Sequence, residues 1–300
     1  MRVLQMWNKF WFESGDSYSL GLFRLVFSGI LLVTQSLRFL EFSLLYSDSG
    51  LLPFSLAKTF APPNYQPLFY WFPENDIALK LCYIIYLGFL LAFSLGFIGR
   101  RLCWLILFFH LMFIQRNFTI NYGADLVSNF FLFALCFTNS HRYFSLKKKI
   151  FPNWSMPPSH WLDSVGLRLI QVQLCVIYAF TGLEKMKGTE WWEGTAVWTV
   201  LTNSQLAPFD FSFFAYVPLV VVAMTWATLL FEVYFPVVIW FRHLRPYWLL
   251  LGFSFHAGAA FFMSLPFFSM IMVSGYIVFL SQDQWAWFIH RGRQLLKFES

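Results

Sequence analysis

The chain has 300 residues, of which 58% are hydrophobic and only 12% are charged, whereas a soluble domain carries about 25% charged residues. This composition excludes a soluble globular protein and predicts an all-α, polytopic integral membrane helical bundle. The net charge of +6 does not indicate a nucleic-acid partner, because basic residues in short loops beside membrane segments, such as Lys147 to Lys149, are typical of contacts with anionic lipid.

The apolar segments indicate how often the chain crosses the membrane. Met1 to Gly15 is polar and aromatic, with no apolar run or small-residue cleavage pattern, so we expect no cleavable signal peptide. Eight apolar segments follow: Tyr18 to Phe39, Ile77 to Ile98, Leu102 to Ile114, Ala124 to Phe137, Val165 to Phe180, Phe211 to Trp240, Tyr247 to Met263 and Phe267 to Leu280. A spanning helix needs about 20 residues, and shorter ones are tolerated inside a bundle. We therefore predict about eight membrane helices in one domain over 1–300, with a very tight turn at Pro266 and no large extracytoplasmic domain.

Basic residues predict the orientation, because Lys and Arg are retained in short cytoplasmic loops. With the N-terminus inside, thirteen basic residues fall on the cytoplasmic side: Arg2, Lys9, Arg100, Arg101, Arg142, Lys147, Lys148, Lys149, Arg242, Arg245, Arg291, Arg293 and Lys297. Four fall on the other side: Lys58, Arg116, Lys185 and Lys187. This distribution predicts an even number of spans with both termini in the cytoplasm, and it places Lys185 at the extracytoplasmic face.

The cysteines and the absent motifs argue against common cofactors. Cys82, Cys103, Cys136 and Cys175 lie inside apolar segments without a CxxC pair, which favours small buried hydrophobic residues over a disulfide or zinc site. The sequence has no P-loop, Rossmann glycine pattern, HExxH or CxxCH motif. We therefore expect neither a metal nor a nucleotide.

Three polar residues inside apolar segments need an explanation, because an ionisable group within the membrane is costly. Arg24 lies in the first segment, and Glu232 in the sixth is its possible counter-ion. We interpret them as candidates for a structural ion pair. His256 has no charged neighbour in sequence, so it is either a hydrogen-bonded packing residue or a proton shuttle or quinone contact.

A charged cluster follows the fifth apolar segment, within Thr181 to Gly194. Its members are Glu184, Lys185, Lys187, Glu190 and Glu193. A lysine near a helix end commonly extends its ammonium to water, but a lysine in an apolar pocket can serve as a base near neutral pH. At helical spacing Gly182, Lys185 and Thr189 share one face, and Glu184 does not. Lys185 is therefore the candidate for an inward-facing base, and the other four charges are expected to mark a wet rim.

Several motifs resemble one family in their order along the chain. Gly182-Leu183-Glu184-Lys185-Met186, followed by Glu190-Trp191-Trp192-Glu193-Gly194 and Ala207-Pro208-Phe209, resembles the catalytic-lysine region of the vitamin K-dependent gamma-glutamyl carboxylases. Ser19 to Arg24 resembles the first membrane segment of those enzymes, Asn139 to Ser145 the loop after the fourth, and Phe255-His256 a late histidine-bearing helix. The chain is identified as a member of the HTTM type of bacterial membrane domain, homologous to the carboxylase's membrane half.

The resemblance implies a chemistry. In the carboxylases a lysine base deprotonates vitamin K hydroquinone, oxygen adds to the anion, and the resulting alkoxide removes a proton from a substrate glutamate, which then captures carbon dioxide. It implies Lys185 as the base, His256 as a site-shaping residue and a reduced quinone as cofactor. Substrate or cofactor contacts are expected from Asn121, Tyr122, Asp125, Glu184 and Trp191. Tyr122 stands roughly where the carboxylases have a histidine, so either Asp125 takes over a polar role there or the reaction differs.

Three functions follow as hypotheses. The main one is a carboxylase-like enzyme that couples quinone oxidation at an extracytoplasmic lysine site to carboxylation or other modification of a peptide. The alternative is an accessory component for maturation or export of a secreted peptide, similar to HTTM members that act with partner proteins on peptide toxins. The third is a small-molecule transporter, motivated by Arg24, Glu232 and His256. In each case we expect a protein of the bacterial cytoplasmic (inner) membrane, with the bilayer as a partner.

Overall fold

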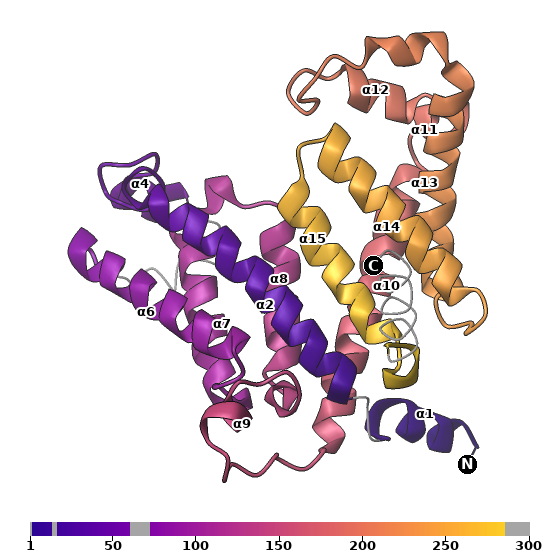
Figure 1. Ribbon diagram of the computed structural model, residues 1–300. Coiled ribbons are helices and arrows are strands. Elements are labelled where there is room, and N and C mark those ends of the chain that lie inside the picture. The colour runs from indigo at the N-terminus through magenta and orange to yellow at the C-terminus, as the bar shows by residue number, and fades with distance from the viewer. Residues whose placement is uncertain (1, 14–16, 61–72, 286–300) are drawn as a thin grey trace, which may run out of the picture. The chain divides into compact units, whose positions relative to one another are not determined.

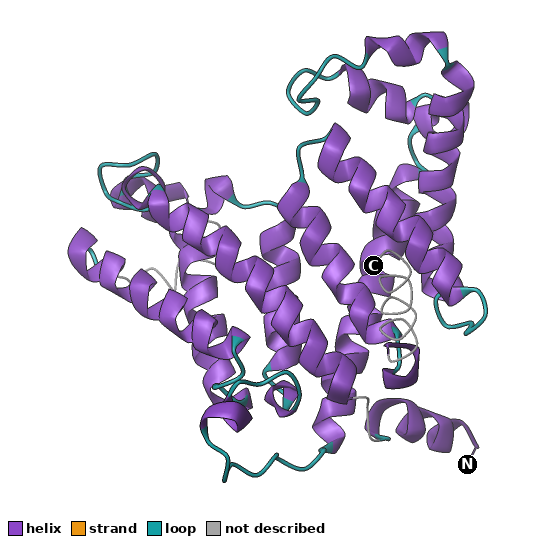
Figure 2. Ribbon diagram, viewed as in Figure 1, coloured by secondary structure: helices purple, strands orange, loops and turns teal. Residues whose placement is uncertain are grey.

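The computed structural model describes residues 2–13, 17–60 and 73–285, and all regular structure in these ranges is helical (Figures 1 and 2). The all-α prediction is confirmed for this part of the chain. Arg291, Arg293 and Lys297 of the cytoplasmic set lie outside the described residues. The chain divides into two compact units, residues 1–170 with 280–300 and residues 171–279. The single domain over 1–300 stays a prediction.

The first unit is built mainly from α2, α6, α7 and α8. Its helices are α1 (Arg2–Phe12), α2 (Ser17–Leu40), α3 (Phe42–Leu45), α4 (Phe54–Phe60), α6 (Asp76–Ser94), α7 (Arg100–Arg116), η1 (Phe118–Ile120), α8 (Gly123–Leu135), η2 (Ser140–Arg142) and α9 (Lys147–Ile150). Asn75 starts α6, because its side-chain oxygen accepts the backbone N–H of Ile77 at 2.8 Å. α2 packs against α6, and α7 packs against α8. In the core, the ring centres of Phe23 and Phe131 lie 5.2 Å apart.

The second unit contains the later part of α10 (Trp161–Lys185), which begins in the first unit. It continues with α11 (Thr189–Glu193), α12 (Ala196–Thr202), η3 (Ser212–Tyr216), α13 (Pro218–Val238), α14 (Arg245–Phe262), α15 (Pro266–Ser274) and η4 (Gly275–Phe279). Proline opens both α13 and α15, where its missing N–H is not needed. α14 and α15 pack together, and the predicted tight turn between them is confirmed, with Ser264 in a left-handed conformation at φ 55°.

The predicted membrane segments correspond to helices with different limits. Among the described residues, four helices are long and apolar enough to cross a membrane: α2, α6, α10 and α13. α8 is shorter, as is the combined stretch Pro266–Phe279. The predicted segment Phe211 to Trp240 is wrong at its start, because η3 comes first and α13 begins only at Pro218. The chain is thus an integral membrane protein with four candidate spans, and the count of eight stays a prediction.

Arg24 is fully buried in the first unit, and its guanidinium donates to five backbone carbonyls. Nη1 donates to Phe93 and Ser94 at 2.5 Å each, and the other three acceptors are Ser140 (3.3 Å), Tyr143 (3.2 Å) and Phe144 (2.7 Å). Phe93 and Ser94 end α6, so their carbonyls lack partners within the helix and lie at its partially negative end. The predicted ion pair between Arg24 and Glu232 is therefore corrected. Arg24 holds a helix end and a loop of the first unit, and the partner of Glu232 is Lys185.

We predict that Arg24→Met destabilises the protein by at least about 3 kcal/mol, because several buried carbonyls lose their donor. Arg24→Lys should lose less stability, since an ammonium has three donors where the guanidinium fork has five. Thermal unfolding in detergent measures both effects. The control is Arg101→Met, because Arg101 is exposed. An equal loss of stability in that variant would contradict the role of Arg24 in holding the buried carbonyls.

Candidate functional site

Lys185 forms a largely buried ion pair in the second unit. It is the last residue of α10, and its Nζ lies 2.7 Å from Oε2 of Glu232 in α13. The Glu232 side chain is 3% exposed and that of Lys185 is 24% exposed. Gly182 permits this approach, since a Cβ there would lie 2.9 Å from the backbone nitrogen of Val233. The ammonium also lies 5.4 Å from the ring centre of Trp191, so Lys185 has two partners of complementary charge or quadrupole.

The other charges of the cluster are exposed, as the sequence predicts for a wet rim. Lys187 and Glu184 form a solvent-exposed pair at 2.6 Å, which contributes little to stability. Glu184 thus contacts Lys187, whereas the partner of Lys185 is Glu232. The expected shared face of Lys185 and Thr189 is wrong, because α10 ends at Lys185 and Thr189 begins α11. Lys185 still points inward because Glu232 is buried beside it.

A buried tyrosine–histidine cluster joins α10 to α14 and η4 within the second unit. Tyr178, two turns before Lys185 on α10, has its hydroxyl 2.7 Å from Nε2 of His256 and 2.6 Å from the hydroxyl of Tyr276. His256 is buried, and its Nδ1 has no hydrogen-bond partner in the described residues. These contacts show a hydrogen-bonded His256, and whether it also carries protons stays a prediction.

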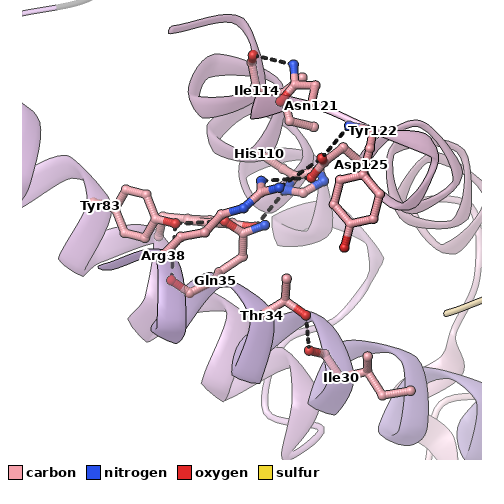
Figure 3. Close-up of polar contacts among 11 residues, drawn as sticks. Ile30, Thr34, Gln35, Arg38, Tyr83, His110, Ile114, Asn121, Tyr122 and Asp125 are labelled. Atoms are coloured by element: carbon pink, nitrogen blue, oxygen red, sulfur yellow. Dashed lines mark hydrogen bonds and ion pairs between the residues drawn. The ribbon is translucent and has the colours of Figure 1, made fainter. Parts of the chain in front are cut away.

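In the first unit, a second buried ion pair joins α2 to α8. The Arg38 guanidinium contacts both carboxylate oxygens of Asp125, at 2.8 and 2.9 Å. This bidentate geometry is the strong form of the interaction. Asp125 also accepts the backbone N–H of Tyr122 at 3.2 Å, so the same carboxylate holds the first turn of α8. Figure 3 shows the carboxylate facing Arg38.

Further polar side chains surround this pair, and we call Gln35, Arg38, Tyr83, Tyr86, His110 and Asp125 the Arg38 cluster. Tyr83 donates to the side-chain oxygen of Gln35 at 2.7 Å, and the Tyr86 hydroxyl lies 2.8 Å from Nδ1 of His110. The amide nitrogen of Gln35 and Nε2 of His110 are buried without a partner in the described residues. The cluster therefore keeps two unused hydrogen-bonding groups, which is uncommon for buried polar atoms.

Tyr122 and Asn121 flank the Arg38 cluster. Burial raises the pKa of the Tyr122 phenol above its ordinary value, and the nearby Asp125 carboxylate raises it further. The phenol therefore stays neutral at physiological pH. Asn121 donates to the carbonyl of Ile114 at 2.7 Å and turns away from Arg38 in Figure 3. Asn121, Tyr122 and Asp125 thus belong to the first unit, whereas Lys185, Trp191 and His256 belong to the second.

Sequence reasoning missed several of these residues. Arg38 lies inside the predicted segment Tyr18 to Phe39, so a count of loop charges passes over it. The rule that singled out Arg24, that a charge within a membrane segment needs a partner, applies equally to Arg38. Tyr178 could have been found from its spacing of seven residues before Lys185, which puts both on one helix face. Nothing in the sequence marks Tyr276 beyond an aromatic residue in an apolar run.

No group of three or more His, Cys, Asp or Glu side chains able to hold a metal occurs among the described residues. The four cysteines are free; Cys103, Cys136 and Cys175 are buried and Cys82 is half-buried. The hydrogen-bonding groups of the tyrosine–histidine cluster that could contact a quinone oxygen are used mainly on one another.

Comparison with known proteins identifies the family. The HTTM domain model matches residues 12–285, so the chain belongs to the HTTM family, as the sequence motifs predict. The chain is also similar to Sporulation-delaying protein SdpB of Bacillus subtilis (strain 168), with 29% identity over 123 residues. The matched part is 39% of this chain and 38% of the relative. No solved structure matches the chain.

We predict strong energetic coupling between Lys185 and Glu232. Lys185→Met should cost about 3 kcal/mol, because removing one partner leaves a buried carboxyl group unpaired. The double variant Lys185→Met/Glu232→Leu should lose less than the sum of the single variants, since a well-packed apolar pair can replace a buried ion pair. Chemical unfolding in detergent measures this cycle.

The exposed pair of Glu184 and Lys187 provides the matched control. Its cycle should show a coupling below about 0.5 kcal/mol. Additive losses at Lys185 and Glu232 would contradict the structural ion pair.

Proposed function

We propose that this HTTM-family membrane protein is an accessory component in the maturation or export of a secreted peptide. The observation that carries the proposal is the ion pair between Lys185 and buried Glu232. An ammonium held at 2.7 Å from a carboxylate has no lone pair, so its nitrogen must first release a proton before it can accept one from a substrate. The geometry therefore supports a role in joining α10 to α13 better than a role as free base.

The similarity to the sporulation-delaying protein supports the same proposal. That name indicates a biological process and no chemical reaction. The accessory function needs a membrane scaffold with extracytoplasmic polar surface, and the exposed residues Glu184, Lys187, Glu190 and Glu193 supply charged groups beside α10 and α11. A partner peptide or partner maturation protein would meet this rim.

The proposal includes the finer topology. The eight apolar segments would form a bundle in the bacterial cytoplasmic membrane, with both termini inside and Lys185 at the extracytoplasmic side. The four long helices α2, α6, α10 and α13 supply the full-length spans, and the shorter apolar helices would be accommodated inside the bundle.

A carboxylase-like enzyme is the second candidate function, and the partial exposure of Lys185 favours this hypothesis. With 24% of its side chain accessible, Lys185 could meet a ligand from the open side. Against it, His256, the residue expected to shape a quinone site, is engaged: its Nε2 lies 2.7 Å from the Tyr178 hydroxyl, which also contacts Tyr276. The transporter reading has less support, because Arg24, Glu232 and His256 each contact partners within their own unit.

We predict that deleting this chain in the bacterium that encodes it removes a specific mature peptide from the culture medium. Mass spectrometry of the secreted peptides, with and without deletion, measures this. Complementation with the wild-type chain should restore the peptide, and Lys185→Met/Glu232→Leu should also restore it, because the pair acts through packing.

Reduced-quinone oxidation by the purified protein separates the two readings. Turnover that is present in wild-type protein and abolished in Lys185→Ala would support the carboxylase-like enzyme and overturn the accessory proposal. The exposed Lys187→Ala variant serves as the matched lysine control. An unchanged set of secreted peptides after deletion would also count against the proposal.

A further inference from the structure

The N-terminal helix α1 has one apolar and one polar face. Val3, Leu4, Met6 and Trp7 fall on the same side at helical spacing, and Gln5 lies opposite them. These four apolar side chains are between 59% and 81% exposed, and α1 contains no buried residue. An apolar face left open in this way marks a contact with a membrane or another molecule.

The end of α1 is held against the start of α10. Arg168 donates to the Phe10 carbonyl at 3.0 Å and lies 4.5 Å from the centre of the Phe10 ring. Phe12 meets Trp161 edge to face at 5.7 Å. α1 is thus fixed at the level where α10, a candidate membrane span, begins (Figure 1).

The chain connection gives the same level independently. α1 ends at Phe12 and α2 begins at Ser17, so the two helix ends are at most about 18 Å apart. α2 has 24 residues, which is about 36 Å at the rise of an α-helix, enough to cross the hydrocarbon core of about 30 Å. Its first residue therefore lies near a membrane surface, and the end of α1 stays within about 18 Å of that residue.

We propose that α1 lies in the plane of the membrane, on the leaflet where α2 and α10 begin, with Val3, Leu4, Met6 and Trp7 inserted at the boundary between headgroups and acyl chains. Amphipathic helices with basic residues at the polar face and Trp, Leu and Phe on the other bind in this way.

The charges identify the lipid as anionic. Arg2 and Lys9 are exposed on α1, and the one acid beside them, Glu13, lies 3.8 Å from Lys9 in a solvent-exposed contact that is weak. Basic side chains at a helix edge attract the anionic lipids of the cytoplasmic leaflet. The loop charges predict that the N-terminus lies on that side, so the basic helix edge and the lipid surface carry opposite charges.

Spin labels on opposite faces test the proposal in the full chain. Val3→Cys and Gln5→Cys are labelled in nanodiscs of zwitterionic lipid, with or without phosphatidylglycerol. The unsubstituted chain, labelled in parallel, supplies the background from its native cysteines. The label at Val3 should lie about 5–10 Å below the headgroup boundary, with high accessibility to oxygen and low accessibility to a nickel chelate in the water. The label at Gln5 should show the reverse.

The anionic lipid should reduce the mobility of both labels, and the double variant Arg2→Gln/Lys9→Gln should abolish that reduction. Equal exposure of both labels to the nickel chelate in every lipid would overturn the proposal. Dipolar coupling between labels on two copies, without oxygen exposure, would also overturn it and indicate self-association. Labels insensitive to phosphatidylglycerol would remove the anionic partner from the proposal.

Discussion

The fold depends on one constraint: a charge removed from water must find partners inside the protein. Arg24 meets it without any carboxylate, because five carbonyl oxygens surround its guanidinium. A cation suits this position, since the last carbonyls of α6 carry the partial negative charge of the helix end. The loop through Ser140 to Phe144 is thereby drawn to the same point as α6, and α2 becomes the element around which the first unit is organised.

The two buried ion pairs apply the constraint differently. Each joins helices through side chains far apart in the chain, 87 residues for Arg38 and Asp125 and 47 for Lys185 and Glu232. Arg38 uses both arms of its guanidinium on one carboxylate, and Asp125 in addition holds the start of α8. Lys185 is a single point charge with a flexible stem, and it depends on Gly182 for the close approach of α10 and α13. The first pair is geometrically fixed by two contacts, and the second is fixed mainly by helix packing.

These distances in the chain explain what could be predicted. The apolar segments, the turn at Pro266, the inward direction of Lys185 and the exposed rim around it follow from local composition and helical spacing. The partner of Glu232 cannot be predicted in this way, because Arg24 and Lys185 are both cations and sequence spacing does not show which of them lies beside Glu232. A sequence also does not show which backbone carbonyls will accept from a side chain. A lone arginine in an apolar segment therefore suggests an acidic partner, although carbonyls at a helix end can satisfy it, as they do for Arg24. The sequence also does not predict that α10 ends at Lys185. The charged residues after Lys185 are compatible with a continuous helix, but in the structure Gly188 lies between α10 and α11.

The contrast between the two ion pairs bears on function. A pair that holds helices together gains from burial and two-point contact, as with Arg38 and Asp125, whose side chains are 12% and 3% exposed. Lys185 and Glu232 have a different arrangement, in which the acid is buried and the base is accessible at a helix end beside Trp191. The ammonium and the carboxylate neutralise each other, so the pair presents little net charge to an incoming group. A role in joining α10 to α13 needs neither proton transfer nor a free ammonium, and a well-packed apolar pair can serve in its place.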